Sequence, residues 1–229
     1  MNMIKNYLAY GSKKVFMAAY VLFPIMMIAM VWILELIFGS AESSFQATFS
    51  IITMVWTMIV ICISDRFSIG TILVNNSQIN EIAKTSPVGE KLTQNVVKWD
   101  IFMRLILITL TIAGVLSSEL LYWEGGAMKF ILKVLLAISV CHSATSLFCW
   151  VCRKIENMTI STIIYSFGTL YMLPYAFIIV AFNKIPITVP VISMIVFTAA
   201  DILINAFGIK LIKRFIKNEW YKDTVVKGR

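Results

Sequence analysis

The chain has 229 residues, of which 59% are hydrophobic and only 14% are charged, and its formal net charge is +8. Soluble domains carry about 25% charged residues. The low charged fraction and the mean hydropathy of +0.85 together exclude an ordinary soluble protein. The excess of positive charge indicates basic loops beside anionic lipid rather than a nucleic-acid surface, and no nucleic-acid partner is expected.

Six long apolar runs predict an all-α polytopic membrane protein whose single transmembrane domain covers residues 1–229. A helix needs about 20 apolar residues to cross a membrane. The predicted spans are 15–38, 47–64, 101–121, 130–151, 160–182 and 188–209. Residues 1–14 place apolar side chains on one helical face, as in a helix lying in the interface. Residues 210–229 form a basic tail, and no room is left for a soluble enzyme domain.

Positive charge alternates between dense and sparse connections along the chain. All but three of the twenty Lys and Arg residues lie in the two tails, in the connection between spans two and three, or in that between spans four and five. The exceptions are Lys129, Lys133 and Lys184. Because basic loops stay in the cytoplasm, both termini are predicted to be cytoplasmic in a multi-pass protein of the cell membrane. Trp99 and Trp150 are expected at the inner interface.

Four cysteines lie inside spans or at their inner ends: Cys62, Cys141, Cys149 and Cys152. The pair Cys149 and Cys152 has the spacing of half a redox or zinc site, but no second pair or flanking histidine completes it. We therefore expect small, reduced, buried thiols and no metal site.

Residues 65–100 form the one long cytoplasmic connection. Its first part, 67–74, is apolar and is expected to extend the second helix beyond the membrane. A short helix is predicted over 78–84. Ser86 suits an N-cap and Pro87 suits the first helical position, so a second helix should begin there and lead into the third span.

The segment Ile82-Ala83-Lys84-Thr85-Ser86-Pro87-Val88, with Glu90-Lys91 after it, resembles the inner loop of ABC-transporter permeases of the exporter superfamily. The chain is similar in length and layout to the small six-span permeases for antimicrobial or cytolytic peptides and bacteriocin immunity. The resemblance implies an N-terminal interfacial helix and a cytoplasmic coupling helix that docks on an ATPase. The coupling residues that it implies are Glu81, Lys84, Thr85, Ser86, Pro87, Val88, Glu90 and Lys91.

The resemblance also implies partners and a cargo. These are two copies of an ABC ATPase subunit, a second permease chain in a homo- or heterodimer, and membrane lipid. The cargo would be a hydrophobic or amphipathic peptide, toxin or drug. The sequence contains no Gly-x-x-x-x-Gly-Lys-Ser/Thr loop, so ATP and magnesium would bind the partner ATPase, and no cofactor is expected on this chain. It is expected not to be an enzyme.

Ionisable residues inside the spans are candidates for function, because charge is unfavourable in the hydrocarbon layer. Asp201 and His142 lie deepest, whereas Glu35 and Glu119 lie near outer ends and are expected to reach water. Asp201 and Asn205 share one helical stripe, which should face protein or a cavity.

Three roles stay open for Asp201: a contact with a neighbouring helix, for instance through His142; a cargo path; or a proton relay with His142. An ion- or proton-coupled transporter or channel that uses these two residues is therefore the alternative function.

The fifth span carries Tyr171 and Tyr175 on one face, with Pro174 predicted to kink the helix between them. The resemblance places spans two and five at the subunit interface, so this helix would border the cargo path. Ordinary helix packing is the alternative.

Overall fold

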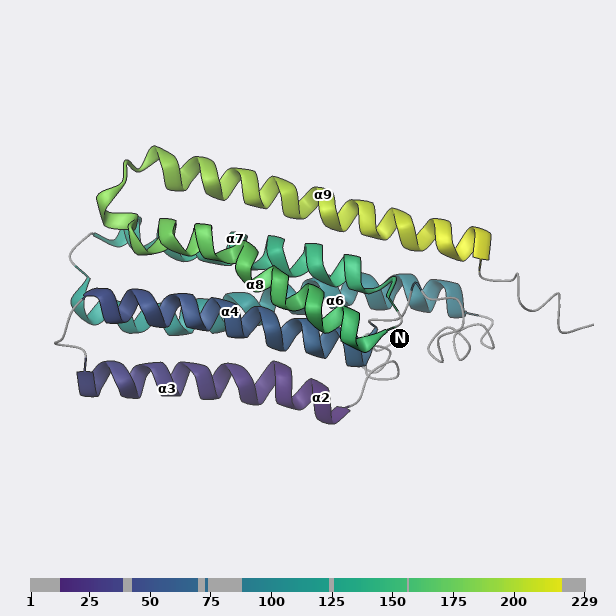
Figure 1. The fold of residues 1–229 in the computed structure, drawn as a ribbon, viewed down its shortest axis with the longest axis horizontal. Coiled ribbons are helices and arrows are strands. Elements are labelled where there is room, and N and C mark those ends of the chain that lie inside the picture. The colour runs from purple at the N-terminus through teal and green to yellow at the C-terminus, as the bar shows by residue number, and fades with distance from the viewer. Residues whose placement is uncertain are drawn as a thin grey trace, which may run out of the picture.

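The computed structural model describes residues 13–38, 43–69, 73, 88–123, 126–155 and 157–219. Within them the chain forms six long helices that run back and forth along one axis (Figure 1). The prediction of an all-α protein is confirmed. The predicted interfacial helix lies, apart from Lys13 and Lys14, outside the described residues, and so does residue 220 onward of the basic tail.

The elements follow one another with short connections, except between α4 and α6, where most of the connection lies outside the described residues. In chain order they are α2 (Lys13–Met17), the π-helical turn η1 (Ala18–Leu22), α3 (Phe23–Phe38), α4 (Ser43–Ser68), α6 (Gly89–Leu116), the 3-10 helix η2 (Ser117–Tyr122), α7 (Ala127–Cys152), α8 (Met158–Val180), the 3-10 helix η3 (Phe182–Lys184) and α9 (Thr188–Glu219). We call the end of the bundle where α4, α7 and α9 finish and α6 begins the basic end.

Pro24 explains the wide turn inside the first long helix. Its ring nitrogen carries no hydrogen, so it cannot donate to the carbonyl of Tyr20 as the α-helical pattern requires. The N–H of Phe23 donates instead to the carbonyl of Ala18, five residues back, which is the π-helical pattern. The elements α2, η1 and α3 therefore form one continuous helix.

Two predicted helix boundaries differ from the structure. α4 ends at Ser68, and the described residues after it, Ile69 and Leu73, are not helical, whereas the rest of the extension predicted over 67–74 lies outside the described residues. The short helix before the third span and that span form one helix, α6. It begins at Gly89 instead of Pro87, and Val88 precedes it without a side-chain cap.

Four helical stretches are long and apolar enough to cross a membrane: Lys13–Ile37, Gly89–Leu120, Ala127–Cys152 and Thr188–Asn218. Within the described residues, α4 and α8 are not among them. By helix length and hydropathy the chain is a multi-pass membrane protein. The count of six spans and the orientation stay predictions.

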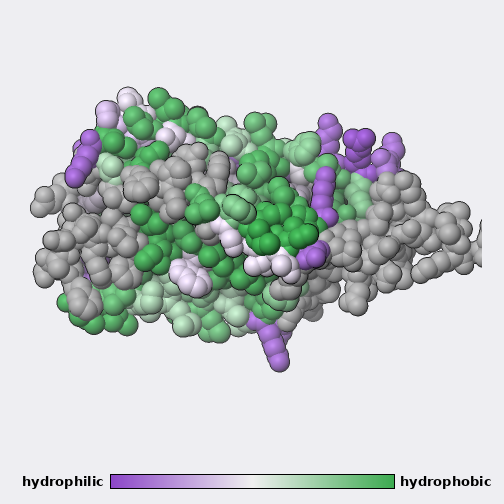
Figure 2. Space-filling view, in the orientation of Figure 1, coloured by the Kyte–Doolittle hydropathy of each residue, from purple (hydrophilic) through white to green (hydrophobic). Residues whose placement is uncertain are grey.

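The bundle exposes apolar side chains and buries charged ones, the reverse of a soluble protein. Leu36 and Leu203 are each 70% exposed, whereas Asp100, Arg104 and Arg153 are 0% exposed. Figure 2 shows hydrophobic side chains across the middle of one face and hydrophilic ones clustered where α9 ends. Lipid around the bundle accounts for the exposed apolar surface, because hydrocarbon solvates such side chains as well as a protein core does.

Helix α7 lies at the centre of the bundle and packs against α4, α6, α8 and α9. Its contact with α9 is the most extensive and includes one very close approach. A Cβ atom built on Gly208 of α9 would overlap the indole ring of Trp150 on α7. Only glycine allows this approach, as is common where membrane helices pack closely.

Candidate functional site

Four charged side chains from three helices meet in the interior near the basic end. Asp65 lies in the last turn of α4, Asp100 and Arg104 lie one turn apart on α6, and Arg153 directly follows α7. Each of them is at most 1% exposed. We call these four residues the buried charge cluster.

Arg153 is the centre of the buried charge cluster. Its Nη2 lies 2.5 Å from Asp65 Oδ1 and 2.6 Å from Asp100 Oδ2. Its Nε donates to Asp65 Oδ2 at 3.4 Å. Arg104 completes the group, with its Nε 3.1 Å from Asp100 Oδ2. Two carboxylates therefore face two guanidinium groups, and the cluster carries no net charge.

This pairing stabilises the Arg153 cation away from water. Burial alone would lower the pKa of Arg153, but the carboxylates of Asp65 and Asp100 raise it above its ordinary value. Moving a single ion out of water costs several kcal/mol, and an opposite charge at hydrogen-bond distance offsets that cost. This mutual compensation holds the ends of α4 and α7 against the Asp100 turn of α6.

Sequence reasoning misses the buried charge cluster, since it counts Arg104 and Arg153 among cytoplasmic cations that face lipid headgroups. The four-residue spacing of Asp100 and Arg104 is the local signal that an ion pair forms on α6. Nothing local connects them with Asp65 or Arg153, which are distant in sequence and come together only when the helices pack.

Trp150 joins the buried charge cluster to α9. The guanidinium carbon of Arg153 lies 4.5 Å from the centroid of its ring, a cation–π contact. Its Nε1 donates to Asn205 Oδ1 at 3.1 Å. The side chain is only 6% exposed, so the prediction of an interfacial Trp150 is wrong.

The polar stripe of α9 faces α7 along its length. Its contacts are Thr198 Oγ1 with Ser139 Oγ at 3.2 Å, Asp201 Oδ2 with His142 Nδ1 at 2.8 Å, and Asn205 Nδ2 with Ser146 Oγ at 3.1 Å. Asn205 Nδ2 also lies 2.9 Å from Asp201 Oδ1. The stripe is therefore turned towards α7, as polar groups in a membrane helix should be, with Asn205 buried and Thr198 still exposed.

Asp201 makes the contact with His142 that the first of its three predicted roles describes. The other two roles, a cargo path and a proton relay, stay predictions. The Asp201 side chain is 18% exposed. His142 Nε2 is buried without a hydrogen-bond partner in the part of the chain that the structure describes.

A second ion pair lies at the opposite end of the bundle. Lys133 Nζ is 2.5 Å from Glu119 Oε2 and 5.4 Å from the centroid of the Trp123 ring. Glu119 is 5% exposed and Glu35 is 3% exposed, so the prediction that these carboxylates reach water is wrong. Lys133 is also neutralised by its partner, which leaves this end of the bundle still less positive.

The four cysteines are free and buried, as predicted. Cys62 Sγ lies 3.9 Å from Cys149 Sγ across the α4–α7 contact. No group of three side chains suited to a metal ion occurs among the described residues.

Only part of the predicted coupling segment lies in the described residues. Val88 is 50% exposed at the start of α6, Lys91 is exposed and Glu90 is half-buried. The remaining coupling residues lie outside the described residues: Glu81, Lys84, Thr85, Ser86 and Pro87.

The side chains of Tyr171, Pro174 and Tyr175 are likewise outside the described set. Helix α8 runs through these positions, and the kink at Pro174 stays a prediction.

Fold and site together define a multi-pass helical membrane protein with a charged interior at its basic end. Comparison of the chain with protein-family models, with curated proteins and with solved structures found no match. Membership of the ABC exporter permeases therefore stays a proposal.

The substitution R153M tests whether the buried charge cluster holds the basic end together. Removing the central cation leaves two carboxylates facing Arg104 alone, and breaking a buried ion pair destabilises a protein by about 3–5 kcal/mol. We expect a lower midpoint of thermal unfolding for the protein purified in mild detergent, followed by tryptophan fluorescence.

The double variant R153M/D65N restores electrical neutrality and should melt at a higher temperature than R153M. The control K213Q removes an exposed cation at the same end of the bundle, outside the buried charge cluster, and should melt like the unchanged protein. A double variant that melts no higher than R153M would contradict the electrostatic account.

Proposed function

We propose that this chain is the membrane-spanning subunit of an ATP-driven ABC exporter, with a separate ATPase docking at the basic end. The observation that carries this proposal is the position at which α6 begins. It begins at Gly89, well before the apolar stretch predicted over 101–121, so it projects past the predicted membrane boundary. Val88 at its tip exposes half of an apolar side chain, which would gain by contact with a partner surface.

In this proposal the protein lies in the cell membrane with both termini in the cytoplasm. Two such chains, identical or different, would pair with two ATPase subunits. ATP and magnesium would bind those subunits, since this sequence lacks a phosphate-binding loop. The residues that contact the ATPase would be those of the coupling segment that ends at the start of α6.

A cleft between α4 and α8 supports the proposal that the cargo is amphipathic. Its volume is about 250 Å³, and α4 contributes apolar side chains to it, such as Ile59 and Ile63. From α8 come hydroxyl groups, such as those of Ser161 and Ser166. Tyr165 and Arg66 also line the cleft, and the Tyr165 hydroxyl is buried without a hydrogen-bond partner among the described residues. An apolar wall opposite hydroxyl-bearing residues, together with the Arg66 cation, suits a peptide or drug with one apolar face.

The substitution V88E tests the docking site. A charge at the tip of α6 would disfavour burial against the ATPase, so we expect much less ATPase to copurify with the tagged chain in mild detergent. K98Q is the matched control, because it changes the net charge equally at an exposed position of the same helix. Recovery of the unchanged chain without any nucleotide-binding partner, or equal losses in both variants, would contradict the proposal.

One observation favours a second candidate function, proton-coupled transport. Buried His142 and partly exposed Asp201 form a pair at 2.8 Å between α7 and α9, which is the minimum for a relay. Among the described residues no further carboxylate contacts this pair, so we rank this function second.

Proteoliposomes that contain only this chain separate the two functions. An imposed pH gradient should persist, because an exporter permease without its ATPase moves no protons. If the chain dissipates the gradient and D201N abolishes this activity while S139A does not, proton-coupled transport replaces the exporter proposal. Ser139 contacts the same stripe but does not titrate, which makes it the appropriate control.

A further inference from the structure

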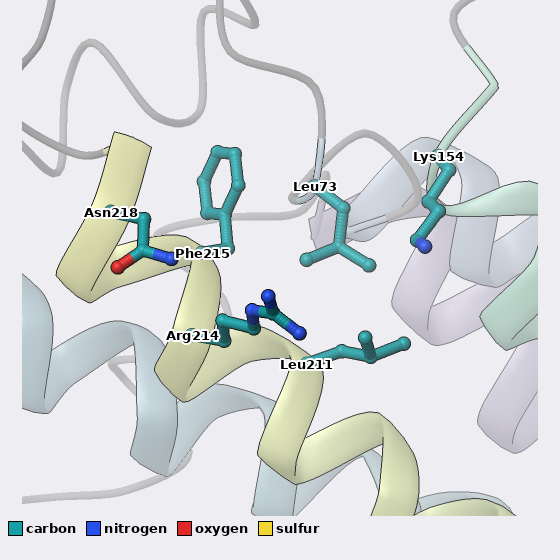
Figure 3. Close-up of a pocket in the computed structure, with 6 residues that line it drawn as sticks. All are labelled: Leu73, Lys154, Leu211, Arg214, Phe215 and Asn218. Atoms are coloured by element: carbon teal, nitrogen blue, oxygen red, sulfur yellow. The ribbon is translucent and has the colours of Figure 1, made fainter.

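A cleft of about 560 Å³ opens at the basic end of the bundle, and none of the four residues of the buried charge cluster lines it. It lies between the last turns of α9, the connection after α7, and Leu73 (Figure 3). The residues that line it are Leu73, Lys154, Leu211, Arg214, Phe215 and Asn218. We call it the basic cleft.

The chemistry of the basic cleft is that of an anion site with an apolar floor. Lys154 and Arg214 reach into it from opposite sides (Figure 3). Asn218 adds an amide, and no acidic residue is among those that line the cleft in the described chain. Guanidinium groups bind phosphate oxygens through paired hydrogen bonds, and an ammonium group adds a point charge. Leu73 and Leu211 supply apolar contacts beside these cations.

The apolar floor of the cleft continues along the outer surface of α9 towards the middle of its length. Leu203, Phe207 and Leu211 are spaced four residues apart, so they form one ridge on this helix. Leu203 is 70% exposed and Phe207 is 63% exposed. They lie on a helix long and apolar enough to cross the membrane, where lipid chains and not a soluble partner would cover them.

We propose that the basic cleft binds the phosphate headgroup of an anionic phospholipid, with an acyl chain along the ridge of Leu203, Phe207 and Leu211. Lys154 and Arg214 hold the phosphate from two sides. The location fits the basic end, because anionic lipid and positively charged loops gather on the same face of a membrane. This site does not depend on the ATPase partner.

Native mass spectrometry of the full chain, titrated with phosphatidylglycerol and with phosphatidylcholine, tests the site. The unchanged chain should retain phosphatidylglycerol in preference to phosphatidylcholine. K154Q/R214Q should lower the apparent affinity for phosphatidylglycerol by about tenfold, because two charge-assisted contacts are lost. K213Q/K217Q removes the same charge from exposed positions of α9 that do not line the cleft, and should bind phosphatidylglycerol as the unchanged chain does.

Two further arms make the result decisive. K154R/R214K keeps both charges and should keep the preference, which separates lost binding from misfolding. Inorganic phosphate should compete poorly, since it lacks the acyl chain. Equal losses in K154Q/R214Q and K213Q/K217Q would overturn the site in favour of general surface charge. Displacement of the lipid by an equal concentration of inorganic phosphate would overturn the lipid assignment.

Discussion

A guanidinium group inside an apolar helical bundle needs carboxylates within hydrogen-bond distance, and in this protein that requirement determines how the helices meet at the basic end. One nitrogen of Arg153 contacts Asp65 of α4 and Asp100 of α6 together. Neither the end of α4 nor the end of α7 can move away from Asp100 on α6 without leaving a charge unpaired where little water is available to solvate it. The resulting contact has a defined geometry, which packing of apolar side chains alone would not provide.

The rest of the bundle depends on this junction through α7. His142, Ser146 and Trp150 are spaced four residues apart and present one polar face to α9. Trp150 lies at the point where that face meets the charged side chains, since it contacts Arg153 and Asn205 at once. Helix α9 therefore needs little other support from protein, and most of its surface is left for lipid. A polar interior and an apolar exterior are two results of the same arrangement.

The helical class and the approximate position of every long helix follow from the sequence, because runs of apolar residues persist whatever the tertiary structure. The stripe on α9 is also predictable, since Asp201 and Asn205 obey the helical period. The sequence does not predict which neighbouring helix the stripe faces. The pairing of Asp65 with Arg153 depends on contacts between distant segments. Trp150 resembles an interfacial residue by its position near a helix end, but Asn205 and Gly208 on α9 turn its ring into the core.

The same limit applies to Glu119, whose partner Lys133 lies across a connection and removes it from water. Sequence position locates a residue along the membrane normal, whereas packing decides whether its side chain faces lipid, water or protein. The coupling function is harder still to predict from the sequence, because it depends on a surface and on a partner protein. It rests on the claim that the basic end of the bundle faces the compartment that contains ATP.

Labelling of single cysteines in intact cells tests that claim most directly. The four native thiols are buried and can be replaced, after which Lys98→Cys reports on the basic end and Met128→Cys on the opposite end. With a thiol reagent that does not cross membranes, Met128→Cys should be modified in intact cells and Lys98→Cys only after permeabilisation. Modification of Lys98→Cys in intact cells, with Met128→Cys protected, would contradict the orientation and the proposed docking of an ATPase.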